Sequence, residues 1–521
     1  MSGVWLAVLA ALAALVAYDL FQRNHAIIRN FPVVGHFRYW LEAIGPELRQ
    51  YIVTSNNEER PFSRDQRRWV YASAKRENNY FGFGSDNEME TVSNYLVIKH
   101  QTFPLLLQPV PGAEDPNVEH RLPCAKVLGG ARGRARAFRP PSAINVSGMS
   151  FGSLSGRAVE ALNRGAKLAG CLHNTGEGGV AAHHLHGGDL VWQVGTGYFG
   201  CRHLDGSFDM ARLKEQVARH PQIRAIEIKL SQGAKPGMGG LLPRAKITPE
   251  VAAVRGITTD RDCVSPSSHS AFSDADSLLD FAEAIAAETG LPVGIKSAVG
   301  ELAFWHDLAR LMAAGSRGVD FVAIDGGEGG TGAAPLVFSD HVALPFKQAF
   351  ARVHRVFVEH SVHERVVFAG SGKLGFPETA LFAFALGVDM VNVGREAMLA
   401  VGCIQAQRCH TNHCPTGVAT QNAWLARGLD PTLKSVRLAN YVVNLRKELT
   451  ALSHACGKLH PALVTADQLE LTDGRFGSRT LSELFDYGAE YGLPSPADRD
   501  AIARLMRGVE AASPERPSQS S

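Results

Sequence analysis

Two stretches in the second half of the chain decide the fold: Val366-Val-Phe-Ala-Gly-Ser-Gly-Lys373 and Met390-Val-Asn-Val-Gly-Arg395. Each is a short apolar run that ends in glycine and a cationic side chain, and residues 378–386 between them follow a helical pattern. Short apolar runs that alternate with amphipathic helices are typical of parallel strands joined by crossover helices. The two stretches therefore predict neighbouring strands of one parallel sheet.

Six earlier runs repeat this pattern as far back as residue 143. They cover residues 143–150, 171–176, 190–195, 225–230, 293–297 and 321–326, and helical patterns over 156–169, 277–289 and 301–314 separate several of them. Eight strand-like runs over roughly 250 residues predict an α/β fold, a (β/α)8 TIM barrel, with a doubly wound sheet as the alternative. In a barrel, the polar residues that close the runs converge on one mouth.

Glycine-rich turns follow the last two runs. They are Gly370-Ser371-Gly372 and Gly394-Arg395. Glycines let backbone amides approach a phosphate, and barrels commonly bind one at the loops after strands seven and eight. The turns therefore predict a phosphate-bearing cofactor, and the alternative is a pair of ordinary turns with a surface arginine.

Lys296 closes the fifth run and is expected to point into the mouth. There it could stabilise negative charge on a reduced flavin or form a Schiff base. Pairing with a neighbouring carboxylate such as Glu301 is the structural alternative. The glycine-rich loop over residues 325–332, after the sixth run, could lie against a planar ring.

A long excursion separates the fourth and fifth runs and opens with Lys229, Gln232 and Lys235 among glycines. Excursions of about 60 residues are usually functional. Two lysines beside flexible glycines suit an anionic, carboxylate-bearing substrate, and a solvated loop is the alternative.

Three cysteines, Cys403, Cys409 and Cys414, lie within twelve residues, with Pro415 and Gly417 close behind. Their spacing does not match the paired knuckles of structural zinc sites or the ferredoxin patterns. A three-iron cluster with one thiolate on each iron fits best, and three small buried apolar residues are the alternative. Iron binding requires reduced thiols, which favours the cytoplasmic side of a membrane.

The ends of the chain frame this barrel. Residues 3–18 carry no charge, and Arg23 and Arg29 follow, so residues 1–21 are expected to form a signal anchor in the inner (cytoplasmic) membrane, with the barrel in the cytoplasm. A helix packed on the protein surface is the alternative. The expected divisions are an accessory region over 22–130, the barrel with its iron–sulfur loop over 131–460, and a C-terminal extension with a disordered tail over 461–521.

Composition excludes one class of partner. The chain has 521 residues, 45% of them hydrophobic, and a net charge of +2. Such a chain has no bulk affinity for nucleic acid.

Read together, these stretches resemble the FMN-binding synthase domain of glutamate synthases. The resemblance runs from about residue 143 to 421 and rests on ordered motifs, namely residues 149–155 (MSFGSLS), 174–179 (NTGEGG), 228–237 (IKLSQGAKPG), 265–269 (SPSSH), 293–296 (VGIK), 326–332 (GGEGGTG) and 403–421 (CIQAQRCHTNHCPTGVATQ). It implies FMN, a [3Fe-4S] cluster on the three cysteines, and reductive conversion of 2-oxoglutarate and ammonia, via the 2-imino acid, to L-glutamate.

The resemblance also implies roles for individual residues. Lys296 and Glu177 would be catalytic, and Lys229, Gln232 and Lys235 would border the substrate. The residues implied to hold FMN are Met149, Ser150, Asn174, Lys296, Gly329, Gly330, Gly370, Ser371, Gly372, Gly394 and Arg395.

The sequence departs from the family at three points. No N-terminal cysteine opens a glutaminase domain, since the first cysteine is Cys124. About 100 residues follow Gln421, which are too few for the large C-terminal β-helical domain of the full enzymes. Met238 stands where the family usually has a glutamate. No dinucleotide fingerprint is evident, so electrons are expected from a separate donor protein. An N-alkylglutamate synthase-like enzyme and a membrane-anchored electron-transfer subunit are the alternative functions.

Overall fold

The computed structural model describes residues 2–22, 25–53, 58–80, 82–85, 87–105, 119–488 and 490–507. Within it the chain forms two compact units, Met1–Arg68 and Trp69–Ser521. Each unit is described by itself.

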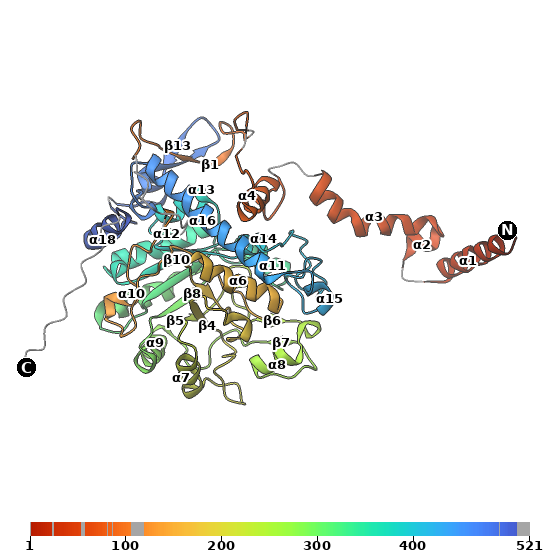
Figure 1. Ribbon diagram of the computed structural model, residues 1–521, viewed down its shortest axis with the longest axis horizontal. Coiled ribbons are helices and arrows are strands. Elements are labelled where there is room, and N and C mark those ends of the chain that lie inside the picture. Colours follow the sequence, from red (N-terminus) through yellow and green to blue (C-terminus); the bar gives the residue numbers. More distant parts are fainter. Residues whose placement is uncertain are drawn as a thin grey trace, which may run out of the picture. The chain divides into compact units, whose positions relative to one another are not determined.

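The larger unit is built on a closed, parallel eight-stranded barrel, as predicted (Figure 1). The strands coincide with the eight apolar runs. In sheet order they are β10 (Val367–Ser371), β11 (Met390–Val393), β2 (Ile144–Val146), β3 (His173–Asn174), β4 (Leu190–Val194), β5 (Ile223–Lys229), β8 (Val293–Ser297) and β9 (Phe321–Asp325).

Strand register brings functional residues level with one another. Lys229 of β5 lies opposite Lys296 of β8, and Asp325 of β9 lies opposite Ser371 of β10. All four residues are at the last position or the last but one of their strands, so they meet at the same end of the barrel. Deeper in the barrel, an apolar cluster that includes Leu172, Phe321 and Met390 fills the interior.

The crossover helices agree with the helical patterns to within a few residues. They include α6 (Gly156–Ala169), α9 (Ala275–Thr289), α10 (Ala303–Ala314) and α13 (Pro377–Ala385). Side chains cap two of them: Ser155 accepts from the backbone of Ala158 at the start of α6, and Asp274 accepts from Ser277 at the start of α9. These bonds satisfy helical N–H groups that otherwise lack partners.

The 25-residue helix α16 (Pro431–Ala455) packs along α6. Gly165 makes the contact close, because a Cβ at this position would lie 2.8 Å from Leu438 and from the carbonyl oxygen of Ser435. Any larger side chain at residue 165 would push the two helices apart.

The long excursion has its own structure. It contains a two-stranded sheet of β6 (Leu241–Leu242) and β7 (Cys263–Val264), with α8 (Pro249–Arg255) between them. The excursion is therefore folded and cannot be a loose solvated loop.

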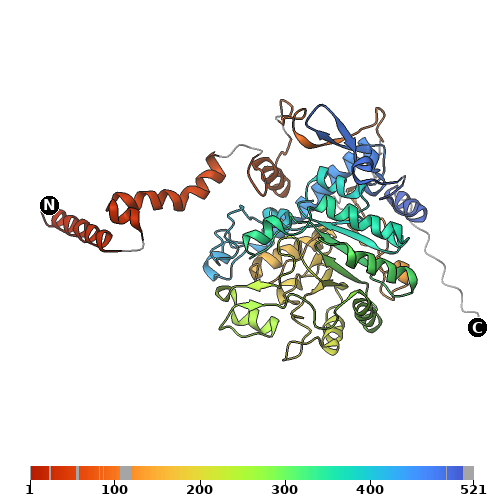
Figure 2. The ribbon, with the colours of Figure 1, turned by 180° about the vertical axis from the view of Figure 1, so that it is seen from behind.

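A three-stranded sheet joins two distant parts of the chain (Figure 2, orange and blue). β1 (Ser93–Ile98) pairs antiparallel with β12 (Leu469–Asp473), which pairs with β13 (Ser478–Thr480). Segments from the expected accessory region and C-terminal extension thus belong to one sheet. The last part of the C-terminal extension, residues 508–521, where the disordered tail is expected, lies outside the described residues.

The smaller unit begins with the apolar helix α1 (Ser2–Phe21), followed by α2 (Ala26–Asn30) and α3 (Val34–Leu48). Among the described residues, one helix, over Gly3–Phe21, is long and apolar enough to cross a membrane, and 6% of its most apolar stretch is buried. A signal sequence passes the same test. Of the two flanking arginines, Arg23 lies outside the described residues.

Candidate active site at the carboxyl ends of the barrel strands

Lys296 and Asp325 form a buried ion pair at the mouth. The Nζ atom of Lys296 lies 3.5 Å from Oδ2 of Asp325, and the two side chains are 11% and 7% exposed. Asp325 is held in turn by the hydroxyl of Ser371 at 2.6 Å and the backbone N–H of Gly233 at 2.9 Å. Lys296 therefore pairs with a carboxylate from the next strand and not with Glu301, which is exposed.

Both members of this pair are held in their charged forms. Burial acts to lower the pKa of Lys296, but the negative charges of Asp325 and Glu227 outweigh burial and raise that pKa. For Asp325, burial acts to raise the pKa, and Lys296 together with the hydrogen bond from Ser371 lowers it below the usual value. The mouth thus holds a fixed ammonium group.

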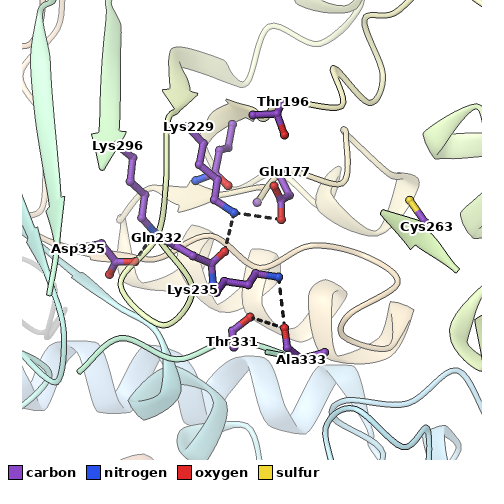
Figure 3. A network of polar contacts seen from close by, with 12 residues as sticks. Glu177, Thr196, Lys229, Gln232, Lys235, Cys263, Lys296, Asp325, Thr331 and Ala333 are labelled. Atoms are coloured by element: carbon purple, nitrogen blue, oxygen red, sulfur yellow. Dashed lines mark hydrogen bonds and ion pairs between the residues drawn. The ribbon is translucent and has the colours of Figure 1, made fainter. Parts of the chain in front are cut away.

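A second pair lies beside the first (Figure 3). Nζ of Lys229 is 3.0 Å from Oε1 of Glu177 and donates to the side-chain oxygen of Gln232 at 2.6 Å. Burial acts to raise the pKa of Glu177, but Lys229 and Lys235 lower it overall, so this carboxylate is ionised. The structure therefore brings together Glu177, Lys229, Gln232 and Lys235.

Lys235 lies near these residues, and its positive charge is less well compensated by neighbouring carboxylates. It is 4% exposed, and its ammonium donates to the carbonyl oxygen of Ala333 at 3.3 Å (Figure 3). Burial lowers its pKa to about 8; Glu177 opposes this shift, and the positive charges of Lys229 and Arg255 add to it. An anionic ligand here would relieve the repulsion among three cations.

His269 ties the excursion to the site. Its Nε2 atom lies 2.9 Å from the carbonyl oxygen of Lys229, and its Nδ1 atom lies 3.1 Å from the hydroxyl of Tyr198. The Tyr198 oxygen also accepts the backbone N–H groups of Ser270 and Ala271. This network fixes the loop over residues 265–271 against the end of β5.

A polar layer supports the mouth from inside the barrel. The side-chain amides of Asn174 and Gln193 both donate to Oε1 of Glu227, at 2.8 and 2.6 Å. Met149 lies just after strand β2, and its backbone N–H donates to the carbonyl oxygen of Asn174. Ser150 is the next residue along the chain. Glu227 is 1% exposed and charged residues so deep are rare.

The two glycine turns lie at the ends of β10 and β11. Gly370 and Ser371 are buried, and Gly372 has a φ of 128°, a conformation that side chains rarely adopt. Gly394 precedes the half-buried Arg395, whose guanidinium donates to the carbonyl oxygen of Glu328.

The loop after β9 approaches the same arginine. A Cβ at Gly330 would lie 2.7 Å from the side chain of Arg395, while the N–H of Gly329 donates to the carbonyl oxygen of Gly326 at 2.8 Å. The glycine-rich loop after β9 therefore lies against Arg395, with backbone and no side chain at Gly330.

The three cysteines lie on a tightly folded loop. Cys403 and Cys409 are half-buried, Cys414 is buried, and all three are free thiols. Gln405, Gln407 and Asn412 have φ values of 61°, 55° and 64°. Left-handed backbone at non-glycine residues is uncommon, which indicates that the surroundings impose the loop's shape.

Lys246 approaches this loop from the excursion. Its ammonium donates to the carbonyl oxygen of Cys409 at 3.1 Å. Burial raises the pKa of Cys409, and the neighbouring Cys414 raises it further. Among the described residues, however, no three His, Cys, Asp or Glu side chains form a group that could hold a metal ion. The structure thus brings Cys409 and Cys414 near each other but does not assemble three ligands.

Sequence reasoning missed three charged residues of the site, and each carried a partial signal. Asp325 closes the sixth apolar run, Glu227 interrupts the apolar alternation of the fourth, and Arg255 ends a helix inside the excursion. A charge within a run that is otherwise apolar points to a buried partner. The identity of that partner depends on strand register.

Comparisons with known proteins agree on one family. Residues 135–459 match the family model described as the conserved region in glutamate synthase. The glutamate synthase large subunit-like protein YerD of Bacillus subtilis is 37% identical over 464 residues, which cover 84% of this chain and 88% of YerD. The archaeal glutamate synthase (NADPH) of Methanocaldococcus jannaschii is 35% identical over 60% of this chain and 59% of its own length.

Among solved structures, a mutant flavocytochrome b2 with pyruvate bound aligns over 98% of both chains, at 14% identity and a TM-score of 0.42. A likeness at that level adds nothing to the barrel described above.

Proposed function

Because the chain belongs to the glutamate synthase family and is a glutamate synthase-like oxidoreductase, we propose that it converts 2-oxoglutarate and ammonia to L-glutamate. The two substrates would lose water to form 2-iminoglutarate, and a hydride and a proton would then reduce the imine. The observation that carries this proposal is the cluster of buried cations at the mouth, with Lys296 beside Asp325 and Lys229 beside Glu177. Such a cluster suits a dianionic keto acid next to an electron-rich cofactor.

The residues present fit FMN, which we propose as the cofactor. Gly372, in a conformation that favours glycine, and the half-buried guanidinium of Arg395 offer the donor set that a phosphate prefers. The residues that would hold the cofactor are Met149, Ser150, Asn174, Lys296, Gly329, Gly330, Gly370, Ser371, Gly372, Gly394 and Arg395. When bound, FMN would supply the hydride.

The chain's own residues would do the rest. Lys296, kept protonated by its carboxylate neighbours, would stabilise negative charge on a reduced flavin. Lys229, Gln232 and Lys235 would bind and orient the carboxylates of the keto acid. Glu177, ionised and next to Lys229, would take up and return a proton at the substrate nitrogen.

A [3Fe-4S] cluster is part of the proposal. Cys403, Cys409 and Cys414 would supply its thiolates once the three side chains are drawn together, and the ammonium of Lys246, which donates to the carbonyl oxygen of Cys409, would place a positive charge nearby. When bound, such a cluster would supply one-electron transfer, and a separate donor protein is the proposed source of electrons.

We also propose that α1 anchors the chain in the inner membrane, with the barrel in the cytoplasm. Its exposed apolar surface supports this. Full-length protein should fractionate with membranes, and deletion of residues 1–21 should release a soluble protein with its flavin still bound. Full-length protein that dissolves without detergent would contradict the anchor.

The test of the function is a single turnover. Protein is reduced anaerobically and mixed with 2-oxoglutarate and ammonium chloride while the flavin absorbance is followed. We expect the flavin to reoxidise only when both substrates are present and one L-glutamate to form per flavin. A reduced flavin that stays reduced would refute the proposed reaction.

Met238 favours one variant of this reaction. It is half-buried, three residues after Lys235, and places an uncharged side chain where the family usually has a carboxylate. An alkylamine is therefore the second candidate nitrogen donor. Methylamine in place of ammonium, in the same single turnover, distinguishes the two.

A further inference from the structure

A small cavity lies inside the barrel, next to the polar layer that supports Lys296. Its volume is about 20 Å³, and its lining includes Asn145, Asn174, Glu227 and Asn392 among apolar side chains such as Phe321 and Met390. A cavity whose volume is determined in this way needs about 10–15 Å³ to hold one water molecule. The space therefore fits one molecule of that size.

Polar groups without partners line this cavity. Oδ1 of Asn145 accepts the backbone N–H of Leu172 at 2.9 Å, which fixes the orientation of the amide, and its buried Nδ2 has no hydrogen-bond partner among the described residues. Asn174 and Gln193 both donate to Oε1 of Glu227, and the hydrogen bonds found among the described residues include none to its Oε2.

Leaving these groups unpaired is unfavourable. An unsatisfied buried donor or acceptor costs roughly 1–3 kcal/mol, and more when it is charged. One molecule that accepts from Asn145 and donates to Glu227 would satisfy both. A metal cation or an ammonium ion cannot accept a hydrogen bond from Asn145, so the occupant must be a neutral molecule that both donates and accepts.

We propose that this cavity is a binding site for a single small neutral molecule, water or ammonia, held between Asn145 and Glu227. The site lies within the barrel and apart from the carboxylate-binding lysines at the mouth. The bound molecule would donate a hydrogen bond to the Glu227 carboxylate. Glu227 in turn helps to keep Lys296 protonated. The occupant thus supports the charge at the active site without touching the substrate.

Water as the occupant of the cavity requires no assumption about the reaction, whereas ammonia as the occupant rests on the proposed function. The two sources can be separated. Crystals of the holoprotein grown without ammonium should show one density peak within hydrogen-bond distance of Nδ2 of Asn145 and Oε2 of Glu227. An empty cavity, in a map that shows other buried waters, would overturn the proposal.

Relaxation dispersion of water ¹⁷O counts long-lived internal waters in solution. Asn145→Leu should remove one such water relative to the wild type, and Asn392→Leu tests the same cavity if the first variant does not fold. An unchanged count in a folded variant would overturn the site. Loss of that water in ammonium chloride near pH 9, but not in sodium chloride, would identify ammonia as the occupant; no loss would identify water.

Discussion

Two buried lysines at the barrel mouth, Lys296 and Lys235, differ in how their charge is held. Lys296 has Asp325 at 3.5 Å and Glu227 within electrostatic reach, and its pKa is raised. Lys235 is as deeply buried, but burial lowers its pKa to about 8, with repulsion from Lys229 and Arg255 adding to the shift.

The difference shows that neighbouring charges, and not burial alone, decide the state of a buried amine. A lysine with its own carboxylates is a permanent cation, whatever binds nearby. A lysine crowded by other cations is poised to gain its charge when an anion arrives. The first arrangement suits a resident cofactor, and the second suits a substrate that comes and goes.

The largest effect is expected at the permanent cation. Lys296→Met should retain FMN, because phosphate binding lies on other loops, but lower the flavin reduction potential and slow reductive turnover by orders of magnitude. Potentiometric titration and single-turnover rates measure both effects. Lys296→Arg should rescue in part, since the planar guanidinium of arginine places the charge differently from an ammonium. The matched control is Lys214→Met, at an exposed lysine. Unchanged potential and rate in Lys296→Met would refute the role.

Removing the counter-charge should make Lys296 behave like Lys235. Asp325→Asn takes away the nearest negative charge, so the pKa of Lys296 should fall. The ammonium would then be lost as pH rises, and turnover at saturating 2-oxoglutarate should acquire an alkaline limb absent from the wild type. A pH–rate profile up to about pH 10 measures this limb. Superimposable profiles would show that Asp325 does not set the charge.

Lys235 should give a smaller, pH-dependent effect on binding. With a pKa of about 8, it is charged below that pH and neutral above it. Affinity for 2-oxoglutarate should therefore weaken by about tenfold as pH rises through 8, an electrostatic loss of about 1.4 kcal/mol. Lys235→Gln should bind weakly at every pH and lose this dependence. If Lys235→Gln keeps the wild-type pH dependence, another group is responsible.

The smallest effect on the mouth is expected from the cysteine loop. Cys409→Ser should lose iron while much of the flavin stays bound, because the two lysines and the glycine turns belong to other segments. Iron and flavin are counted on anaerobically purified protein, and Cys456→Ser, on a buried cysteine outside the loop, is the control. Joint loss of iron and flavin would show that the loop supports the mouth itself.

The sequence predicted the barrel because each strand is a local signal. Runs such as 321–326 and 366–370 became β9 and β10, and Lys296, which closes the fifth run, lies at the carboxyl end of β8. The charge states could not be predicted in this way. They depend on Asp325 lying beside Lys296 and on Arg255 lying near Lys235, contacts between residues that are distant along the chain.

The same limit applies to the polar layer and to the ends of the chain. Glu227 is visible in the sequence as a charge in an apolar run, but its amide partners come from two other strands. The pairing of β1 with β12 joins segments more than 350 residues apart along the chain. Local patterns define each strand, whereas only the closed barrel determines which side chains meet.

The most direct test is the flavin content of the anaerobically purified protein. If the mouth holds FMN beside a permanent cation, the protein is yellow-brown and releases one FMN per chain on denaturation, and Lys296→Met releases the same amount. A colourless protein, or one whose released flavin is not FMN, would contradict the account.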